Sequence, residues 1–175
     1  MSDTNTFVDR EQQFRSWVEE YRTELIRICI IHLSDYNLAE DAVQETFMKA
    51  WKGLNKFEGR NGCSPKTWLI AIAINTCKSY RRTRWFRMSA GANGHEQLPS
   101  HFANMQPEEQ DLLIDISNLP EKYKSVILLY YYQRMTQNEI ADALGISRSL
   151  VNYRLQKALD MLRITLGEEE HNEDH

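Results

Sequence analysis

Residues 119–162 read LPEKYKSVILLYYYQRMTQNEIADALGISRSLVNYRLQKALDML. Thr136 and Glu139 have the spacing of a capping box, which predicts that a helix begins at this point. Gly145 can adopt the left-handed conformation that a tight turn between helices requires, and Ser147 can cap a second helix. The pattern predicts a helix-turn-helix, whose second helix normally enters the major groove of DNA. Five apolar residues would pack the two helices together: Ile140, Leu144, Ile146, Val151 and Leu155.

The second helix of this motif carries polar side chains at the positions that would face outward. Asn and Gln can pair bidentately with adenine, and Arg and Lys with guanine, so these residue types suit the reading of base edges. Helical hairpins that bind no DNA can show the same apolar spacing, so the polar face is what favours DNA binding. The outward residues are Arg148, Ser149, Asn152, Tyr153, Gln156 and Lys157.

The rest of the chain shows helical periodicity, and no segment alternates apolar and polar residues over the length of a strand. The sequence therefore predicts an all-α protein. One long helix is expected to end near His32, and the next to begin at an Asn37–Glu40 capping box and to end near Gly53. Further helices are expected to begin at Thr67, at Pro107 and at Pro120 as a first helical residue, and the last to end at Gly167.

Residues 59–95 contain no acidic residue but hold seven Lys or Arg side chains. Aromatic residues are interleaved with these cations, namely Trp68, Tyr80, Trp85 and Phe86. Cations neutralise phosphates and aromatic faces stack on exposed bases, so the stretch could bind nucleic acid. An ordinary solvated basic helix end with aromatic residues in the core would have the same composition, and both interpretations stay open at this point.

Composition excludes several classes of protein. The net charge of −4 argues against a uniformly basic coat for nucleic acid, and no apolar run is long enough to span a membrane. The polar N-terminus does not resemble a signal peptide, and three cysteines without framework spacing indicate reduced thiols, so we expect a cytoplasmic protein. No metal signature, nucleophile elbow or phosphate-cradling glycine loop is present, so we expect no enzyme activity, catalytic residue, metal or cofactor.

Three stretches together carry a resemblance to a known family. DAVQETFMKAW at 41–51, TWLIAIAINTCKSYRR at 67–82 and the helix-turn-helix stretch resemble bacterial sigma factors of the sigma-70 family. Their order and spacing are similar to the extracytoplasmic-function (ECF, group IV) type, which keeps only regions 2 and 4. The resemblance implies two small helical domains joined by a flexible linker. Region 2 would occupy residues 10–87, the linker 88–106, region 4 residues 107–166 and an acidic tail 167–175.

The resemblance also assigns roles to residues. In region 2, Asp41, Gln44 and Glu45 would dock on the clamp helices of the β′ subunit of core RNA polymerase. Asn75 falls at the family position that helps to hold a base flipped out of the −10 element. The other residues expected to contact the −10 element are Lys78, Ser79 and Arg82. The −35 element would be read by the outward residues of the second helix already named, from Arg148 to Lys157.

The function implied is that of an alternative sigma factor, which binds core RNA polymerase (β′ clamp helices and β flap) and promoter DNA and promotes melting. The family is commonly held inactive by an anti-sigma factor, often membrane-anchored, and such a partner is expected here. The factor itself would not insert into a membrane, and would join the nucleoid when active. Two alternatives stay open: a stand-alone helix-turn-helix regulator, which would bind its promoter tightly without polymerase, and an RNA-binding or anti-termination adaptor, which would have no −35 preference.

Overall fold

The computed structural model describes the backbone of residues 2–57, 63–87 and 106–172, and the side chains of 9–57, 63–83 and 106–163. These residues form seven α-helices and one π-helical turn, without a strand, which confirms the all-α prediction. Nearly all of the expected linker, most of the loop before Thr67, and the side chains of Trp85 and Phe86 lie outside the described residues. The helices are α1 Ser2–Leu33, α2 Tyr36–Phe57, α3 Pro65–Arg87, α5 Pro107–Asn118, α6 Glu121–Ile127, α7 Gln137–Leu144 and α8 Arg148–Asn172, with the π-helical turn η2 at Leu128–Tyr132.

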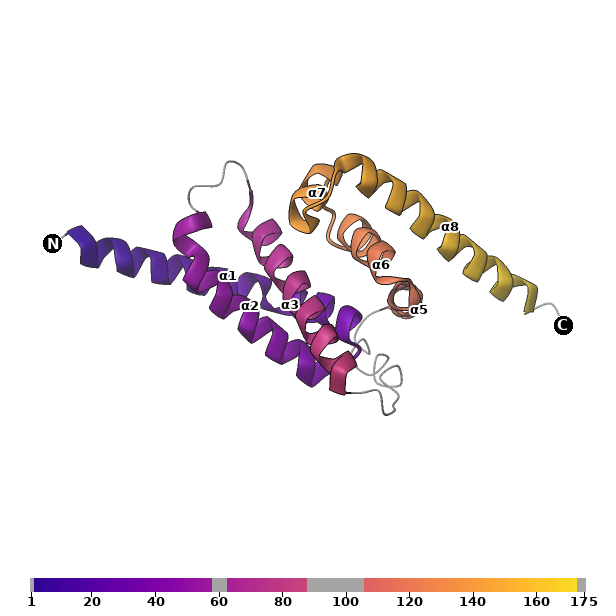
Figure 1. The fold of residues 1–175 in the computed structure, drawn as a ribbon, viewed down its shortest axis with the longest axis horizontal. Coiled ribbons are helices and arrows are strands. Elements are labelled where there is room, and N and C mark those ends of the chain that lie inside the picture. The colour runs from indigo at the N-terminus through magenta and orange to yellow at the C-terminus, as the bar shows by residue number, and fades with distance from the viewer. Residues whose placement is uncertain (1, 58–62, 88–105, 173–175) are drawn as a thin grey trace.

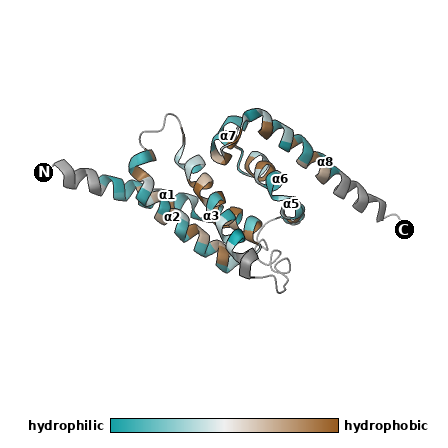
Figure 2. Cartoon of the chain, viewed as in Figure 1, coloured by the Kyte–Doolittle hydropathy of each residue, from teal (hydrophilic) through white to brown (hydrophobic). Residues whose placement is uncertain are grey.

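The helices form two units that follow one another in the chain (Figure 1). In the N-terminal unit, α1, α2 and α3 pack against one another, and in the C-terminal unit α6 packs on α8 and α7 on α8. Each unit has its own buried apolar side chains, and Figure 2 shows hydrophobic and hydrophilic residues alternating along the helices. The units also touch, because α7 packs against α3 and α5 against α1.

Helices α2 and α3 are capped by Asp35 and Ser64, and neither begins at the residue that the sequence predicted. The amide of Leu38 donates to Asp35 Oδ1 at 2.9 Å, so Asp35 caps α2 and the predicted Asn37–Glu40 capping box is wrong. Likewise, the amide of Thr67 donates to Ser64 Oγ at 3.1 Å. Helix α3 therefore begins at Pro65, two residues before the expected start, with proline at the position where its missing N–H costs nothing.

Two glycines expected to end helices lie inside them instead. Helix α2 continues through Gly53 to Phe57, and α8 continues through Gly167 to Asn172. A glycine in a helix interior costs only about 1 kcal/mol relative to alanine, which neighbouring turns and packing can offset. By contrast, Gly145 has φ 65° and ψ 36° and ends α7 as predicted. Of these three glycines, only Gly145 has a positive φ, a backbone conformation that residues with a Cβ rarely adopt.

The C-terminal unit contains a π-helical turn that the sequence pattern did not predict. Pro120 is the N-cap of α6 rather than its first helical residue. Helix α6 then widens into the π-helical turn η2, and the chain reverses through Arg134, whose φ is 56°. Single π-turns interrupt helices where one extra residue is accommodated, often at functional sites. Here the wide turn holds Leu128 and Leu129 fully buried.

Candidate functional site

The helix-turn-helix has the predicted geometry at each of its local signals. The amide of Thr136 donates to Glu139 Oε2 at 2.8 Å, and the amide of Glu139 donates to Thr136 Oγ1 at 3.2 Å, which completes the capping box. After the left-handed Gly145, the amide of Leu150 donates to Ser147 Oγ at 3.2 Å. Helix α8 therefore begins at the residue after Ser147, as the sequence predicts.

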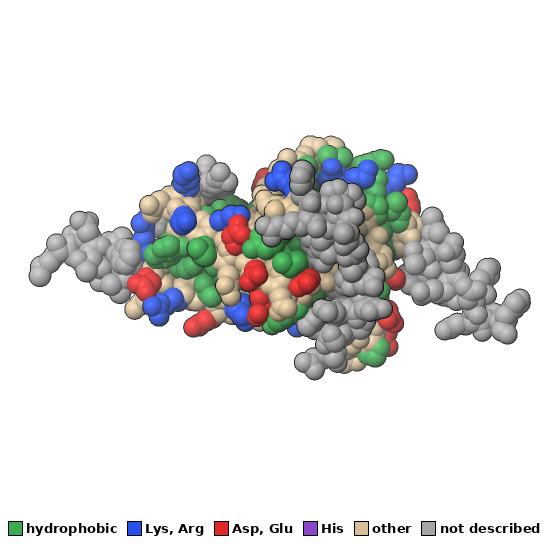
Figure 3. Space-filling model, turned by 60° about the horizontal axis from the view of Figure 1, so that its bottom comes forward, with side chains coloured by type: hydrophobic (Ala, Val, Ile, Leu, Met, Phe, Trp, Pro, Cys, Tyr) green, Lys and Arg blue, Asp and Glu red, His purple; other side chains and the backbone are tan. Residues whose placement is uncertain are grey.

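Helix α8 separates its apolar and polar sides as expected of a recognition helix. Val151, Leu155 and Leu162 are buried against the rest of the C-terminal unit. Figure 3 shows basic side chains over the α7–α8 end of the molecule. All six residues predicted to read DNA are exposed: Arg148, Ser149, Asn152, Tyr153, Gln156 and Lys157.

A hollow of about 660 Å³ lies at the start of this helix, where α7 begins. Two cations, Arg134 and Arg148, line it together with the half-exposed rings of Tyr130 and Tyr131, which meet edge-on with centroids 5.0 Å apart. Sequence reasoning missed Arg134 and both tyrosines, because their positions depend on the π-turn. The remaining lining residues are Met135, Thr136, Gln137 and Asn138.

A second cavity, of about 340 Å³, lies between α2 and α3. Asn75 is exposed and lines it, and so does Ser79, one turn further along α3. Two other residues predicted for the −10 element, Lys78 and Arg82, are exposed but do not line the cavity. Two of the four residues that the sequence grouped therefore line the cavity, and Arg82 contacts one of them, because its Nη2 donates to Ser79 Oγ at 3.5 Å. The other lining residues are Lys49, Gly53, Lys56, Trp68, Ile72 and Thr76.

Trp68 forms part of the wall of this cavity. Its ring stacks on Phe57 with centroids 4.7 Å apart and an interplanar angle of 22°. The indole is only half-buried, so it is packed on one side and accessible on the other. Lys49 and Lys56, which sequence reasoning missed, bring two cations to the α2 side of the cavity. The helical spacing of α2 could have placed these two lysines on one face, but it could not have shown that α3 lies against that face.

The polar stripe of α2 forms the third candidate surface. Asp41 and Gln44 are exposed, but Glu45 is half-buried and pairs with Lys49 at 2.6 Å. The hydrogen bond from Lys49 lowers the pKa of Glu45 despite its partial burial. On the neighbouring helix, burial and a hydrogen bond to Glu45 raise the pKa of Tyr80 to about 12. Glu45 thus holds α2 and α3 together, whereas Asp41 and Gln44 face outward.

The same stripe carries an exposed apolar side chain that was not predicted. Met48 is 61% exposed and follows Gln44 by one helical turn. Trp51 is 38% exposed, and its ring meets that of Phe14 edge-on with centroids 5.2 Å apart. A methionine on an otherwise polar stripe is a signal that the sequence did contain. Large apolar side chains at the surface commonly mark contacts with other proteins.

No helix within the described residues is long and apolar enough to cross a membrane. Among the same residues, no three His, Cys, Asp or Glu side chains gather closely enough to hold a metal ion. The three cysteines are free thiols, and Cys29 and Cys77 are buried.

The chain matches the sequence models of two protein regions, sigma-70 region 2 over residues 17–87 and sigma-70 region 4 over residues 116–162. It is 30% identical to the RNA polymerase sigma factor YlaC of Bacillus subtilis, covering 79% of this chain and 83% of YlaC. It is 31% identical to the ECF RNA polymerase sigma factor SigG of Mycobacterium tuberculosis, over 89% of this chain. It spans about half of SigG, 49% of that protein's length.

Among solved structures, the fold is similar to that of the sigma factor RpoE from Bartonella quintana, which was crystallised in complex with the anti-sigma factor NepR. The TM-score is 0.69 at 20% sequence identity, and the match covers 89% of this chain and 98% of that chain.

Proposed function

Because the chain belongs to the sigma-70 family of RNA polymerase sigma factors, in its extracytoplasmic-function group, we propose that it is an alternative sigma factor that directs core RNA polymerase to promoters. The observation that carries this is the presence, on one chain, of an exposed recognition helix and a cavity lined by Asn75. A stand-alone regulator would need the first but not the second. In this proposal, residues 10–87 serve as region 2, 88–106 as a linker and 107–166 as region 4.

Region 4 would read the −35 element through α8. Asn152 and Gln156 are exposed one turn apart near the start of the helix, where recognition helices reach base edges. The hollow beside Arg148 suits a backbone phosphate, because Arg134 and Arg148 bring positive charge to its wall. Phosphate contacts fix the position of the helix on the duplex, and base contacts then give specificity.

Region 2 would capture one unstacked base of the −10 element in the cavity between α2 and α3. Asn75 offers both a donor and an acceptor, the half-buried indole of Trp68 offers an aromatic wall, and Lys56 offers charge for a phosphate. Taking a base out of the duplex costs a few kcal/mol, which these contacts would offset. Lys78 and Arg82 lie outside the cavity and would contact the backbone of the same strand.

Core RNA polymerase would bind the exposed stripe of α2. Asp41 and Gln44 supply charge and hydrogen bonding, and Met48 supplies apolar area beside them. Glu45 contributes by fixing α2 against α3 rather than by pointing outward. The protein would perform no chemistry of its own, since polymerase makes the transcript, and it would work in the cytoplasm.

A regulatory partner is also proposed. RpoE of Bartonella quintana shares this fold and was crystallised with an anti-sigma factor. We therefore expect an anti-sigma factor to hold this protein inactive, and in the family such partners are often anchored in a membrane.

Run-off transcription with purified core polymerase on fragments of the native genome tests the proposal. We expect discrete transcripts only when both the protein and core are present, and the promoters recovered should share two elements. A stand-alone regulator would instead protect its promoter from nuclease without core and would give no transcripts. An RNA-binding adaptor would change the length of transcripts started by another factor.

A further inference from the structure

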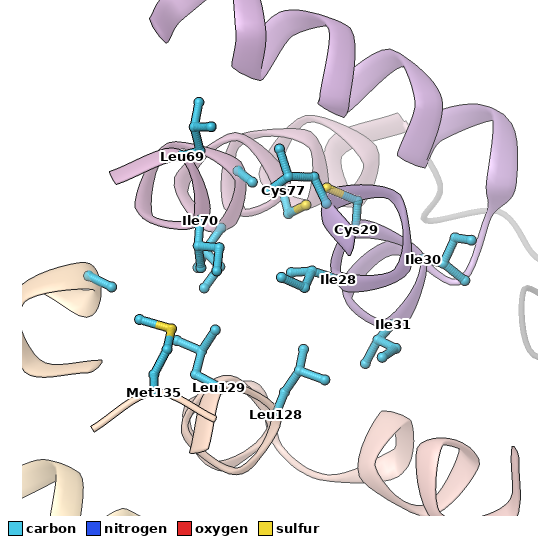
Figure 4. Packing of buried hydrophobic residues seen from close by; sticks show 14 of the residues in the cluster. Ile28, Cys29, Ile30, Ile31, Leu69, Ile70, Cys77, Leu128, Leu129 and Met135 are labelled. Atoms are coloured by element: carbon cyan, nitrogen blue, oxygen red, sulfur yellow. The ribbon is translucent and has the colours of Figure 1, made fainter. Parts of the chain in front are cut away.

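Two cysteines of the N-terminal unit, Cys29 in α1 and Cys77 in α3, lie against one another in its core. Their side chains point toward one another (Figure 4), and a hydrogen bond joins the two thiols. Both residues are 0% exposed, and both are free thiols. Helices α1 and α3 pack directly on each other, so the two sulfurs meet inside the unit rather than at its surface.

The separation of two packed helices suits a disulfide between these residues. Packed helix axes lie about 8–10 Å apart, and the Cα atoms of a helix lie about 2.3 Å from its axis. Cα atoms that directly face each other across such a contact are therefore about 3.5–5.5 Å apart. This range overlaps the separation of about 4.4–6.8 Å over which disulfides join Cα atoms. Cys29 and Cys77 can therefore be bridged without taking α1 and α3 apart.

The third cysteine has no access to this pair. Cys63 is half-buried and precedes the first residue of α3, Pro65, by two positions. Cys77 lies 12 residues after Pro65 in the same helix, a distance of about 18 Å at 1.5 Å per residue. Within the chain, Cys77 can therefore pair only with Cys29.

The surroundings of Cys29 restrain its reactivity. The hydrogen bond with Cys77 and burial raise the pKa of Cys29 well above its usual range. The thiolate is the form that reacts with oxidants, so oxidation should be slow in the resting fold and should proceed through local openings of the helices. The pair is thus suited to sustained rather than brief exposure to an oxidant.

We propose that Cys29 and Cys77 form a redox-active pair, which a hydroperoxide converts to an intramolecular disulfide that ties α1 to α3 and weakens capture of the −10 base. One thiolate attacks a peroxide oxygen and breaks the O–O bond, which releases water after protonation and leaves a sulfenic acid. The second sulfur then attacks the sulfenic sulfur, so the S–S bond forms and the hydroxyl leaves as another water. The two thiols lose two electrons and two protons in all, and the peroxide takes up both.

The consequence for the −10 site rests on the function proposed above. Asn75 precedes Cys77 by two residues on α3, and it lines the cavity between α2 and α3. A covalent bond holds two sulfurs closer than any non-bonded contact, so the disulfide draws α3 toward α1. Binding sites need their side chains within about 0.5 Å of the productive geometry. A shift of α3 relative to α2 therefore misplaces Asn75 relative to the opposite wall of the cavity.

Thiol mapping tests whether the disulfide forms. In the Cys63→Ser protein, hydrogen peroxide should abolish both free thiols, as measured by alkylation in urea, and peptide mass spectrometry should find Cys29 linked to Cys77 within a monomer. Cys77→Ala in the same background is the matched control and should form no bridge. Cys29→Ala replaces it if circular dichroism shows that it does not fold. Two free thiols after prolonged exposure, or sulfinic and sulfonic acids in place of the bridge, overturn the proposal.

A redox equilibrium removes the effect of slow access to the buried thiols. The Cys63→Ser protein is held in mixtures of oxidised and reduced dithiothreitol, once folded and once in urea. The ratio at half oxidation should differ at least tenfold, with the disulfide more stable in the folded protein, because the fold already holds the two sulfurs together. An equal ratio, or a disulfide that is less stable in the folded protein, overturns the proposal.

Promoter melting tests the consequence for the −10 site. Protein that is oxidised and then freed of peroxide before core polymerase is added should give at least threefold fewer open complexes, measured with permanganate, and dithiothreitol should restore them. Cys77→Ala treated in the same way controls for oxidation of methionines and should melt promoters as the untreated variant does. Equal melting by the oxidised and reduced forms overturns the regulatory role. Failure of the sigma function is distinguishable, because the reduced protein would then melt no promoter while the disulfide still formed.

Discussion

Glu121 accepts a hydrogen bond from Nδ1 of His32, a residue 89 positions earlier in the chain. Its second carboxylate oxygen, Oε2, contacts the charges of Arg81 and of Lys124, the latter at 3.7 Å, as ion pairs rather than as aligned hydrogen bonds. Burial opposes ionisation of this carboxyl, but the hydrogen bond from His32 and the surrounding positive charges lower the pKa of Glu121 to about 2. The ionised form is therefore favoured strongly in the folded chain.

Stability should depend on pH through this group. The pKa of Glu121 falls from 4.5 to about 2 on folding, so its contribution is fully present above about pH 5 and is lost as pH falls towards 2. The shift corresponds to about 3 kcal/mol of unfolding free energy. Urea unfolding of the wild type and Glu121→Gln should therefore give stability curves that converge by about 2 kcal/mol between pH 5.5 and 3, with the rest of the difference lost below pH 3. Parallel curves would show that the carboxylate does not titrate in this way.

Binding of core polymerase should depend on the exposed part of the α2 stripe. Because Glu45 pairs with Lys49, changing it would disturb the contact between α2 and α3 as well as the surface. Asp41→Lys with Gln44→Ala avoids this, and we expect an affinity for core at least tenfold weaker, about 1.4 kcal/mol. Glu19→Lys, the same charge change on the exposed face of α1, is the control. Equal affinities measured by fluorescence anisotropy would remove the stripe from the interface.

Promoter melting should depend on Asn75. Asn75→Ala removes a hydrogen-bonding side chain from the α2–α3 cavity, which should cost about 1 kcal/mol, or roughly fivefold in open complexes. Closed-complex binding should change less, because α8, and not Asn75, is proposed to hold duplex DNA. Permanganate reactivity of the melted thymines measures the first quantity and filter binding the second. Asn37→Ala, an exposed asparagine at the start of α2, should change neither.

The recognition helix should separate base reading from phosphate contact. Gln156→Ala and Lys157→Ala should change which −35 bases are preferred, because a lost bidentate contact costs about 1–3 kcal/mol at one position. Arg148→Ala should instead weaken every promoter alike and flatten the salt dependence, because Arg148 lines the hollow proposed for a phosphate. Promoter strength across a randomised −35 library measures both. A uniform loss from all three variants would mean that α8 does not read bases.

Two glycines should respond in opposite ways to alanine. A Cβ at Gly53 would lie 3.4 Å from the Trp68 ring, an ordinary contact, so Gly53→Ala should stabilise the protein by about 0.5–1 kcal/mol. A Cβ at Gly145 would meet nothing within 4 Å, but the backbone there is left-handed. Gly145→Ala should therefore destabilise by about 1–2 kcal/mol from backbone strain alone. Thermal unfolding monitored by circular dichroism compares the two.

Local signals in the sequence predicted the local structure of the helix-turn-helix well. Each of these signals depends only on residues three or four positions away, and the structure confirms all three: the cap at Thr136, the left-handed turn at Gly145 and the cap at Ser147. Helix ends were less predictable where two short polar residues competed, as Asp35 and Asn37 do, because either can cap a helix and packing decides between them.

Features that depend on distant parts of the chain could not be predicted from pattern. The π-turn η2 and the reversal at Arg134 place Tyr130 and Tyr131 beside Arg148, and no residue near them announces a wide turn. The half-buried state of Glu45 follows from the approach of α3. Periodicity identifies a helix face, but which element lies against that face is a property of the whole fold.

Helix α3 packs on α1 and α2 on two of its sides and on α7 on another, while Asn75 opens to the α2–α3 cavity. An α-helix has only 3.6 residues per turn, so each turn of α3 must supply a residue to nearly every one of these directions. Few positions in the middle turns of α3 can then be substituted without disturbing one of these contacts. In a saturation library scored by transcription, tolerated substitutions should be scarcer between 67 and 79 than along α2. If α8 reads the −35 element as proposed, substitutions that change promoter choice should be tolerated more readily on its outer face, which is exposed to solvent.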